Sequence, residues 1–213
     1  RPARVKLVSG MDRYRCFAEL AAAETEGEDW VVRLRPGTSG YCIAAPHGGW
    51  IERGTEFLAD AVAGAEHAFY AFSGLRRRAQ RLHITSDNFD EPRALALIAG
   101  VDTVVTFHGA RGRERCVWFG GLDMALRGAL QAALVEAGFR AFDDASHRRQ
   151  GRGRSNVCNR GRSGRGVQVE LPVGMLKALF DHDRARCAWH INATGERFVA
   201  VFREVLGRGA RIL

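Results

Sequence analysis

Two short apolar segments that each lead to a His-Gly pair constrain the fold of this chain more than any other feature. Tyr41–Ala45 and Val101–Phe107 are mostly apolar or β-branched, and they are followed by His47 and His108. Such runs are typical of strands that are buried on both faces of an α/β sheet. Because open α/β sheets bind ligands at the carboxyl ends of their strands, we expect both histidines at the ligand-binding edge.

Further strands and helices are expected to alternate along the chain. Beyond the two segments above, apolar or β-branched runs predict strands at residues 5–8, 30–34, 68–72, 82–85, 116–119 and 167–171. Helical spacing predicts helices over residues 56–63, 122–137 and 198–205, and another that Asp90 caps, Pro92 begins and Gly100 ends. This order predicts a single α/β domain over residues 1–213, with an open mixed sheet and helices on both faces.

His47, Glu52 and His108 have the side chains of a catalytic zinc site. Neutral imidazole and carboxylate suit zinc, and catalytic sites use three protein ligands so that a fourth position can hold water. His47 and Glu52 are five residues apart, an offset that would turn them about 140° from each other on a helix. A loop bent at Gly48 and Gly49 is therefore expected to carry this pair, with Glu52 just before a helix begins.

A structural interpretation stays open for each histidine taken alone. A single histidine at a strand end is more often a hydrogen-bonded structural group than a metal ligand. The joint pattern favours a metal, since both histidines precede a glycine or a glycine pair, a carboxylate lies nearby, and no HExxH or paired CxxC motif competes for it. By contrast, His83 is expected to be a buried strand residue with a hydrogen-bond partner, and a role beside the metal ligands or in substrate binding is the alternative.

Several segments together resemble one known family. Residues 45–56 are similar to the metal-binding signature of the poly-γ-glutamate hydrolases, which are zinc enzymes of phage and bacterial type. The agreement extends to residues 69–74, 82–86, 89–92, 107–109, 159–164 and 167–171, and it covers roughly residues 41–206. The broader zinc carboxypeptidases usually have an HxxE spacing. This chain instead has four residues between His47 and Glu52, as the poly-γ-glutamate group does.

The resemblance implies a zinc-carboxypeptidase-like fold and a zinc-dependent amidohydrolase or peptidase that cleaves γ-glutamyl amide bonds. It also implies one zinc ion on His47, Glu52 and His108. In Val167–Leu171, strand alternation puts Glu170 on the face opposite the apolar residues. That pattern alone leaves open a solvent-facing strand residue, whereas the resemblance implies a general base beside the metal-bound water.

The chain carries a formal net charge of +8, from 32 lysines and arginines against 24 aspartates and glutamates. Lys6 and Lys177 are its only lysines. Because arginine binds carboxylates and phosphates through paired hydrogen bonds, a polyanionic partner is expected. Net charge alone does not separate nucleic acid from poly-γ-glutamate.

Residues 148–166 contain seven arginines and many glycines just before the expected strand at 167–171. A solvated basic loop, an Arg/Gly-rich RNA-binding segment and a substrate cradle all fit this composition. The lack of interleaved aromatic residues argues against binding of single-stranded nucleic acid. As a cradle, Asn159, Arg160, Arg162 and Arg165 would bind the α-carboxylates of a γ-linked chain. One arginine would polarise the scissile carbonyl, and the resemblance supports Arg160 most, then Arg165.

Other classes are disfavoured by what the sequence lacks. It has no apolar run of 18 residues for a membrane span, no G-x-S-x-G motif of serine hydrolases, and five cysteines at irregular spacings. Residues 1–4 lack the apolar core of a signal peptide. The compartment therefore stays open between a cytoplasmic or phage-released protein and a secreted one whose leader is absent from this chain.

The sequence as a whole predicts a monomeric, endo-acting zinc hydrolase of poly-γ-glutamate that does not bind membranes. The alternative from another class is an arginine-rich nucleic-acid-binding protein without catalytic activity, in which the histidines are structural. Metal content separates the two hypotheses.

Overall fold

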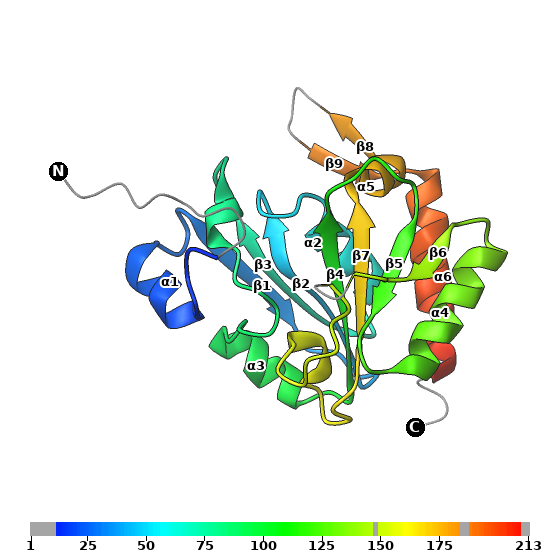
Figure 1. Cartoon of the computed structure of the whole chain (residues 1–213), viewed down its shortest axis with the longest axis horizontal. Coiled ribbons are helices and arrows are strands. Elements are labelled where there is room, and N and C mark those ends of the chain that lie inside the picture. Colours follow the sequence, from blue (N-terminus) through cyan, green and yellow to red (C-terminus); the bar gives the residue numbers. More distant parts are fainter. Residues whose placement is uncertain (1–11, 147–148, 184–187, 210–213) are drawn as a thin grey trace.

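A mixed seven-stranded sheet runs through the centre of the protein (Figure 1). The structure is a computed structural model that describes residues 12–146, 149–183 and 188–209. The sheet has the order β1-β3-β2-β4-β7-β5-β6, and β8 and β9 form a separate hairpin. The strands are β1 (Trp30–Arg35), β2 (Tyr41–Gly49), β3 (Ala68–Gly74), β4 (Thr103–Ala110), β5 (Val117–Gly120), β6 (Ala141–Asp143), β7 (Val167–Pro172), β8 (Phe180–Asp183) and β9 (Ala188–Ile191).

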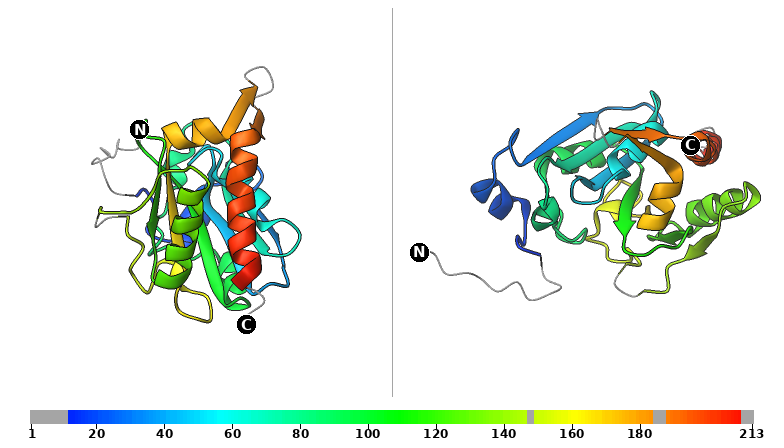
Figure 2. Two further views of the ribbon diagram at one scale, coloured as in Figure 1. Left: turned by 90° about the vertical axis from the view of Figure 1, so that its right-hand side faces the viewer. Right: turned by 90° about the horizontal axis from the view of Figure 1, so that it is seen from above.

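Helices lie on both faces of this sheet. They are α1 (Phe17–Ala23), α2 (Thr55–Ala63), α3 (Pro92–Ala99), α4 (Met124–Glu136), α5 (Val173–Leu179), α6 (Ala193–Gly209), and the 3-10 helices η1 (Ala79–Leu82) and η2 (Val157–Asn159). One core packs α2, α4, α5 and α6 against the sheet, and the other packs α1 and α3 against its opposite face. Figure 2 shows α4 and α6 side by side. The predicted α/β class with an open mixed sheet is confirmed.

The middle of the sheet is parallel. β2 pairs in parallel with β3 and β4, and β4 pairs in parallel with β7. β1 is antiparallel to β3 at one edge, and β5 is antiparallel to β7 towards the other. Since parallel strands end at the same edge, His47 of β2, His108 of β4 and Glu170 of β7 are brought to one rim of the sheet.

Side chains of the central strands alternate between the two cores. In β7, Val167, Val169 and Leu171 enter the core that contains Phe198 and Phe202 of α6. All six residues of β7 are buried, and so are all seven of β3. Burial on both faces explains the near-continuous apolar sequence of β3, whereas Gln168 and Glu170 of β7 are buried polar residues.

The strand predicted at residues 82–85 is wrong. η1 ends at Leu82, and the chain then runs without regular structure. The His83 N–H donates to Gln80 O at 3.2 Å, and the Thr85 N–H donates to the side chain of Asp12 at 2.5 Å. Because a turn and a distant carboxylate satisfy these backbone groups, the segment does not need a strand partner.

The predicted cap of α3 is also corrected. The Glu91 side chain, not that of Asp90, accepts a hydrogen bond from the N–H of Ala94 at 2.8 Å. Asp90 instead accepts a hydrogen bond from the N–H of Phe17 at 2.6 Å, which ties α1 to this region. Pro92 begins the helix and Gly100 follows its end, as expected.

The remaining predicted elements form, although α6 extends well beyond its predicted bounds of 198–205. The exception is the strand expected at 5–8, which lies outside the described residues. The short elements α1, α5, β6, β8 and β9 were not predicted. Within the described part of the chain, none of the helices has the length and apolar character that a membrane crossing requires.

Candidate metal centre

His47, Glu52 and His108 form one cluster at the carboxyl edge of the sheet. Their potential ligand atoms all lie within 4.8 Å of one another. His47 Nδ1 is 3.1 Å from His108 Nδ1 and 3.5 Å from Glu52 Oε1, and His108 Nδ1 is 3.6 Å from Glu52 Oε2. A tetrahedral zinc ion with bonds of about 2.0–2.2 Å holds its ligand atoms about 3.4 Å apart. The spacing of these three side chains fits such an ion.

The turn between β2 and α2 carries Glu52 back to His47. The N–H of Glu52 donates to His47 O at 2.8 Å, and the Thr55 hydroxyl donates to Glu52 O at 2.7 Å. On the side of β4, the N–H of Gly109 donates to Glu52 Oε2 at 2.9 Å. Glu52 therefore lies just ahead of the helix, as predicted. His47, Gly48 and Gly49 belong to β2, so the predicted loop begins only after Gly49.

Hydrogen bonding orients the His47 imidazole. Its Nε2 lies 2.8 Å from the carbonyl oxygen of Ile84. A carbonyl only accepts, so Nε2 carries the proton and Nδ1 presents its lone pair to the cluster. His108 Nδ1 faces this lone pair at 3.1 Å. Two imidazole nitrogens that face each other beside a carboxylate form a set of ligand atoms suited to a bound cation.

The charge of Glu52 is stabilised by its neighbours. Burial alone would raise the pKa of this carboxyl, but the His47 and His108 imidazoles outweigh burial and hold the pKa well below its usual range. Glu52 is thus an anionic ligand at neutral pH. His108 Nε2 is buried and has no hydrogen-bond partner among the residues that the structure describes.

Glu170 lies beside this cluster. It is the register partner of His108 across β4 and β7, and its side chain is on the face opposite the apolar residues of β7. The residue is 6% exposed, so the solvent-facing alternative is wrong. Burial, reinforced by the negative charge of Glu52, raises the pKa of Glu170 to about 8. Gln168 Nε2 donates to Glu170 Oε1 at 3.0 Å and fixes that carboxyl oxygen.

His83 is a site residue that sequence reasoning assigned to a buried strand. Its ring lies against that of His47, with centroids 4.0 Å apart and an angle of 33° between the planes. Asp12 Oδ1 is 2.7 Å from His83 Nδ1. His83 is partly exposed and lines the cavity beside Glu52. The Leu-His-Ile-Thr pattern gave no signal of this role, because it resembles a strand.

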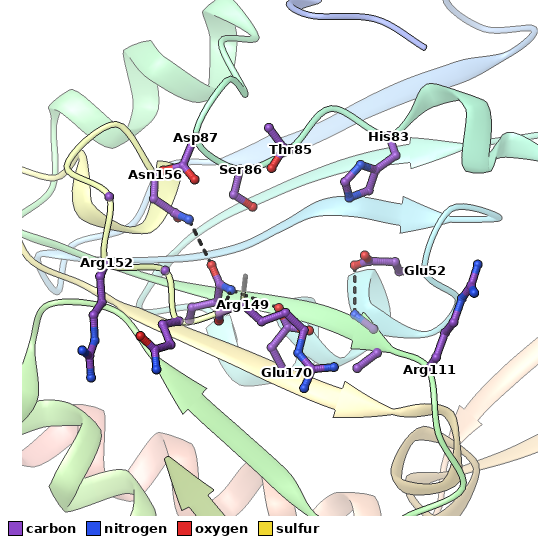
Figure 3. Close-up of a pocket in the computed structure, with 16 residues that line it drawn as sticks. Glu52, His83, Thr85, Ser86, Asp87, Arg111, Arg149, Arg152, Asn156 and Glu170 are labelled. Atoms are coloured by element: carbon purple, nitrogen blue, oxygen red, sulfur yellow. Dashed lines mark hydrogen bonds between the residues drawn. The ribbon is translucent and has the colours of Figure 1, made fainter. Parts of the chain in front are cut away.

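Two cavities meet at the metal cluster. The first, of about 450 Å³, is polar and includes Glu52, Glu170, Arg111, Arg149 and Arg152 in its lining (Figure 3). The second, of about 1080 Å³, shares Glu52, His83, Gly109, Ala110 and Arg111 with the first and continues toward α5 and β9. Glu52 is the member of the cluster that lines both cavities, so it is accessible from two directions.

The arginines predicted as a substrate cradle lie elsewhere. None of Asn159, Arg160, Arg162 and Arg165 lines either of these cavities. The Asn159 side-chain amide donates to Gly151 O at 2.7 Å and Gly153 O at 2.9 Å, so it holds the preceding loop together.

Each of the three arginines has a different setting. Arg160 Nη1 donates to Phe89 O at 3.1 Å, and Arg162 Nε donates to Asp102 at 2.9 Å. Asp102 precedes β4, whose first residue is about 17 Å along the strand from His108 at about 3.3 Å per residue. The Arg165 side chain is exposed just before β7 begins. Substrate binding by these residues is a prediction that this geometry does not favour.

Other arginines lie where the cradle was expected. Arg149 stacks over the Trp118 ring at 4.6 Å and pairs with Asp144 at 3.0 Å. Arg111 and Arg152 line the first cavity and form no ion pair with any residue in the described ranges. Arg149 and Arg152 belong to the arginine-rich segment that the sequence singled out, but their spacing gave no signal that separated them from the rest.

A sequence model of the poly-gamma-glutamate hydrolase family matches residues 14–201. The chain belongs to this family. The resemblance that the metal-binding signature indicated is therefore confirmed.

Relatives and solved structures agree with the assignment. YndL of Bacillus subtilis (strain 168) is 34% identical over 171 residues, which cover 79% of this chain and 67% of YndL. The SPbeta prophage-derived YoqZ of the same organism is 36% identical over 82% of this chain and 64% of YoqZ. The chain thus spans about two thirds of the length of these relatives.

Two solved structures share the fold of this family member. A bacteriophage poly-gamma-glutamate hydrolase superposes with a TM-score of 0.87 at 27% identity, over 95% of this chain and all of that chain. A zinc-free apo form of YndL superposes with a TM-score of 0.84 at 30% identity, over 93% of this chain and 99% of that chain. The first comparison, together with the family match, supports a hydrolase.

Substitution of Gly49 tests how the turn after β2 positions Glu52 next to His47. Its φ is +64°, and a Cβ there would lie 2.2 Å from the backbone oxygen of Gly74. Gly49→Ala is expected to lower the free energy of unfolding by about 2 kcal/mol or more, because left-handed strain alone costs about 1–2 kcal/mol. Urea-induced unfolding measures the change.

A glycine in open space provides the control for this substitution. A Cβ at Gly128 of α4 would meet nothing within 4 Å, so Gly128→Ala should stabilise the protein by about 0.5–1 kcal/mol. If Gly49→Ala unfolds at the wild-type urea concentration, the turn does not need its glycine and the account of Glu52 placement is wrong.

Proposed function

We propose that this protein is a zinc-dependent hydrolase that cleaves γ-glutamyl amide bonds in poly-γ-glutamate. One observation carries the proposal: His47, Glu52 and His108 cluster at zinc-ligand spacing beside a buried Glu170, in a member of the poly-gamma-glutamate hydrolase family. The zinc-free form of YndL adds that a structural relative was prepared without zinc, which supports the choice of metal.

The metal would be held by Nδ1 of both histidines and by the Glu52 carboxylate. Bound zinc supplies a Lewis acid and lowers the pKa of a coordinated water to about 7. The chain itself fixes the ligands: Ile84 O sets the tautomer of His47, and the Gly109 N–H holds Glu52 Oε2. We assign one ion per chain, because the cluster offers three ligands and leaves a fourth position for water.

Glu170 would move the proton. Its Oε1 is engaged by Gln168, which leaves Oε2 for the attacking water and then for the nitrogen of the leaving amine. Burial and the negative charge of Glu52 raise the pKa of Glu170 to about 8. A cation bound to Glu52 would offset that charge and favour the ionised carboxylate, which is the form that accepts a proton from water and later delivers it to the amine.

The basic residues around the first cavity would bind the substrate carboxylates. Arg149 is held in place by Trp118 and Asp144, so little side-chain freedom is lost when it binds an anion. Arg111 and Arg152 extend the positive charge along the cavity. We assign the role predicted for the 159–165 segment to these three arginines instead, and the access from two directions supports endo-cleavage of a long chain.

The nucleic-acid-binding alternative has less support. Arg162 of the basic segment is engaged by Asp102, and the family match covers residues on both sides of that segment. RNA binding without cleavage of the polymer, in the experiment below, would support this alternative.

Poly-γ-glutamate of high molecular mass, incubated with the full chain and zinc, tests the function. Size-exclusion chromatography should show a rapid fall in mean polymer length, as endo-cleavage requires, and α-linked polyglutamate should stay intact. A chelator should stop the reaction, and added zinc should restore it. Unchanged polymer, together with tight RNA binding that weakens steeply with salt, would replace the hydrolase by a nucleic-acid-binding protein.

Glu170→Gln tests the proton-transfer residue. The amide keeps the size of the side chain but cannot accept a proton, so turnover should fall by about 10²-fold or more, the usual scale for lost acid–base catalysis. Zinc content and polymer binding should stay close to wild type. Glu136→Gln, at the exposed end of α4, is the matched control and should be fully active. Near-normal turnover of Glu170→Gln would remove this residue from the mechanism.

A further inference from the structure

The second cavity at the metal cluster differs in character from the first. Val173 and Leu176 of α5, Phe180 of β8 and Trp189 of β9 line its wall, and Ile51 lies near its junction with the metal cluster. The centroids of the Trp189 and Phe180 rings are 5.6 Å apart in an edge-on arrangement, so part of the wall is aromatic. Glu170, Arg149 and Arg152 line only the first cavity. The proposed mechanism does not use this apolar wall.

We infer that this wall binds the acyl half of the substrate through the methylene groups of its main chain, and so selects γ-linked over α-linked glutamate. The inference rests on the proposed function and deepens it. It assigns the second cavity to the glutamyl units whose carbonyl is attacked, and the first cavity to the units that leave as the amine.

The position of Glu170 determines which half of the substrate occupies which cavity. The carboxyl that delivers a proton to the leaving nitrogen must lie on the amine side of the scissile bond. Glu170 is part of the first cavity and not of the second. The amine half therefore occupies the first cavity, and the acyl half extends past Glu52 and Gly109 into the second.

Polymer chemistry explains why an apolar wall belongs on the acyl side. In a γ-linked acyl unit, two methylene groups lie in the main chain directly before the scissile carbonyl. In an α-linked unit, the carbonyl is joined to the α-carbon, and the two methylenes lie in a side chain that ends in a carboxylate. An apolar surface beside Glu52 thus buries methylene area of the γ-linked main chain, which favours binding of that chain.

Basic residues border the wall at positions that suit the α-carboxylates. Arg111 lies at the junction of the two cavities, and Lys177 is four residues after Val173 on the same side of α5. Arg53 also lines this cavity and stacks over the Trp50 ring at 3.5 Å. Lys177 forms no ion pair within the residues that the structure describes. Alternating apolar and cationic contacts match a polymer in which methylene pairs alternate with carboxylates.

Val173 is the residue at which the inference is tested. It is 46% exposed in the wall, so a polar side chain there does not disrupt the core. Binding is measured by calorimetry in the Glu170→Gln background with zinc, which prevents turnover of the ligand. The probes are a γ-linked and an α-linked glutamate tetramer. Val173→Asp should weaken binding of the γ-linked tetramer about 10-fold and change that of the α-linked tetramer less than 3-fold.

Two further variants keep this result interpretable. Val173→Ile retains an apolar wall and should bind the γ-linked tetramer like the background protein. Val135→Asp makes the same change at a residue of α4 that is 55% exposed and outside both cavities, and it should have no effect.

Three outcomes would count against the inference. Unchanged affinity of Val173→Asp for the γ-linked tetramer, in a protein that cleaves poly-γ-glutamate, overturns the apolar subsite alone. An equal loss for both tetramers shows charge repulsion without linkage selection, and it overturns the selectivity. If the wild-type chain cleaves no poly-γ-glutamate and the background protein binds neither tetramer, the proposed function fails and the subsite fails with it.

Discussion

The parallel register of β2, β4 and β7 is the constraint on which the rest of the site depends. Pairing of β2 with β4 brings His47 and His108 to one rim, and pairing of β4 with β7 puts Glu170 directly beside His108. A one-residue slip of β7 would turn Glu170 into the apolar core and Val169 into the cavity. The core side chains that hold the register, such as Val167 and Leu171, therefore also position the chemistry.

Charge balance explains why these groups tolerate burial together. Glu52 and Glu170 are close enough for the charge of one to raise the pKa of the other, and transfer of a carboxylate out of water is costly unless it is paired. The imidazoles of His47 and His108 favour the ionised form of Glu52. A divalent cation at the cluster would compensate the remaining negative charge, and the nearby arginines would keep the polyanionic substrate in place.

The sequence allowed the positions of His47, His108 and Glu170 to be predicted, because an apolar run locates a strand end and alternation decides which face a residue occupies. Their roles in metal binding and catalysis came from residue type and the family resemblance and stay predictions. The sequence did not allow the arginines of the cavity to be told apart. Arg111 directly follows β4, and the positions of Arg149 and Arg152 depend on the loop after β6, which Asn159 holds together through hydrogen bonds to the carbonyls of Gly151 and Gly153. His83 was assigned to a strand because its neighbours are apolar, whereas the Asp12 carboxylate contacts the His83 ring and accepts a hydrogen bond from the Thr85 N–H.

X-ray absorption at the zinc edge of the purified full chain tests the central claim most directly. The account predicts one zinc per chain, with nitrogen and oxygen ligands at about 2.0–2.2 Å and no sulfur, and loss of that signal in His108→Ala. Absence of bound zinc after equilibration with the metal would contradict the account. A sulfur shell at about 2.3 Å would contradict it as well, since it would place the ion on cysteines and leave His47, Glu52 and His108 without their proposed role.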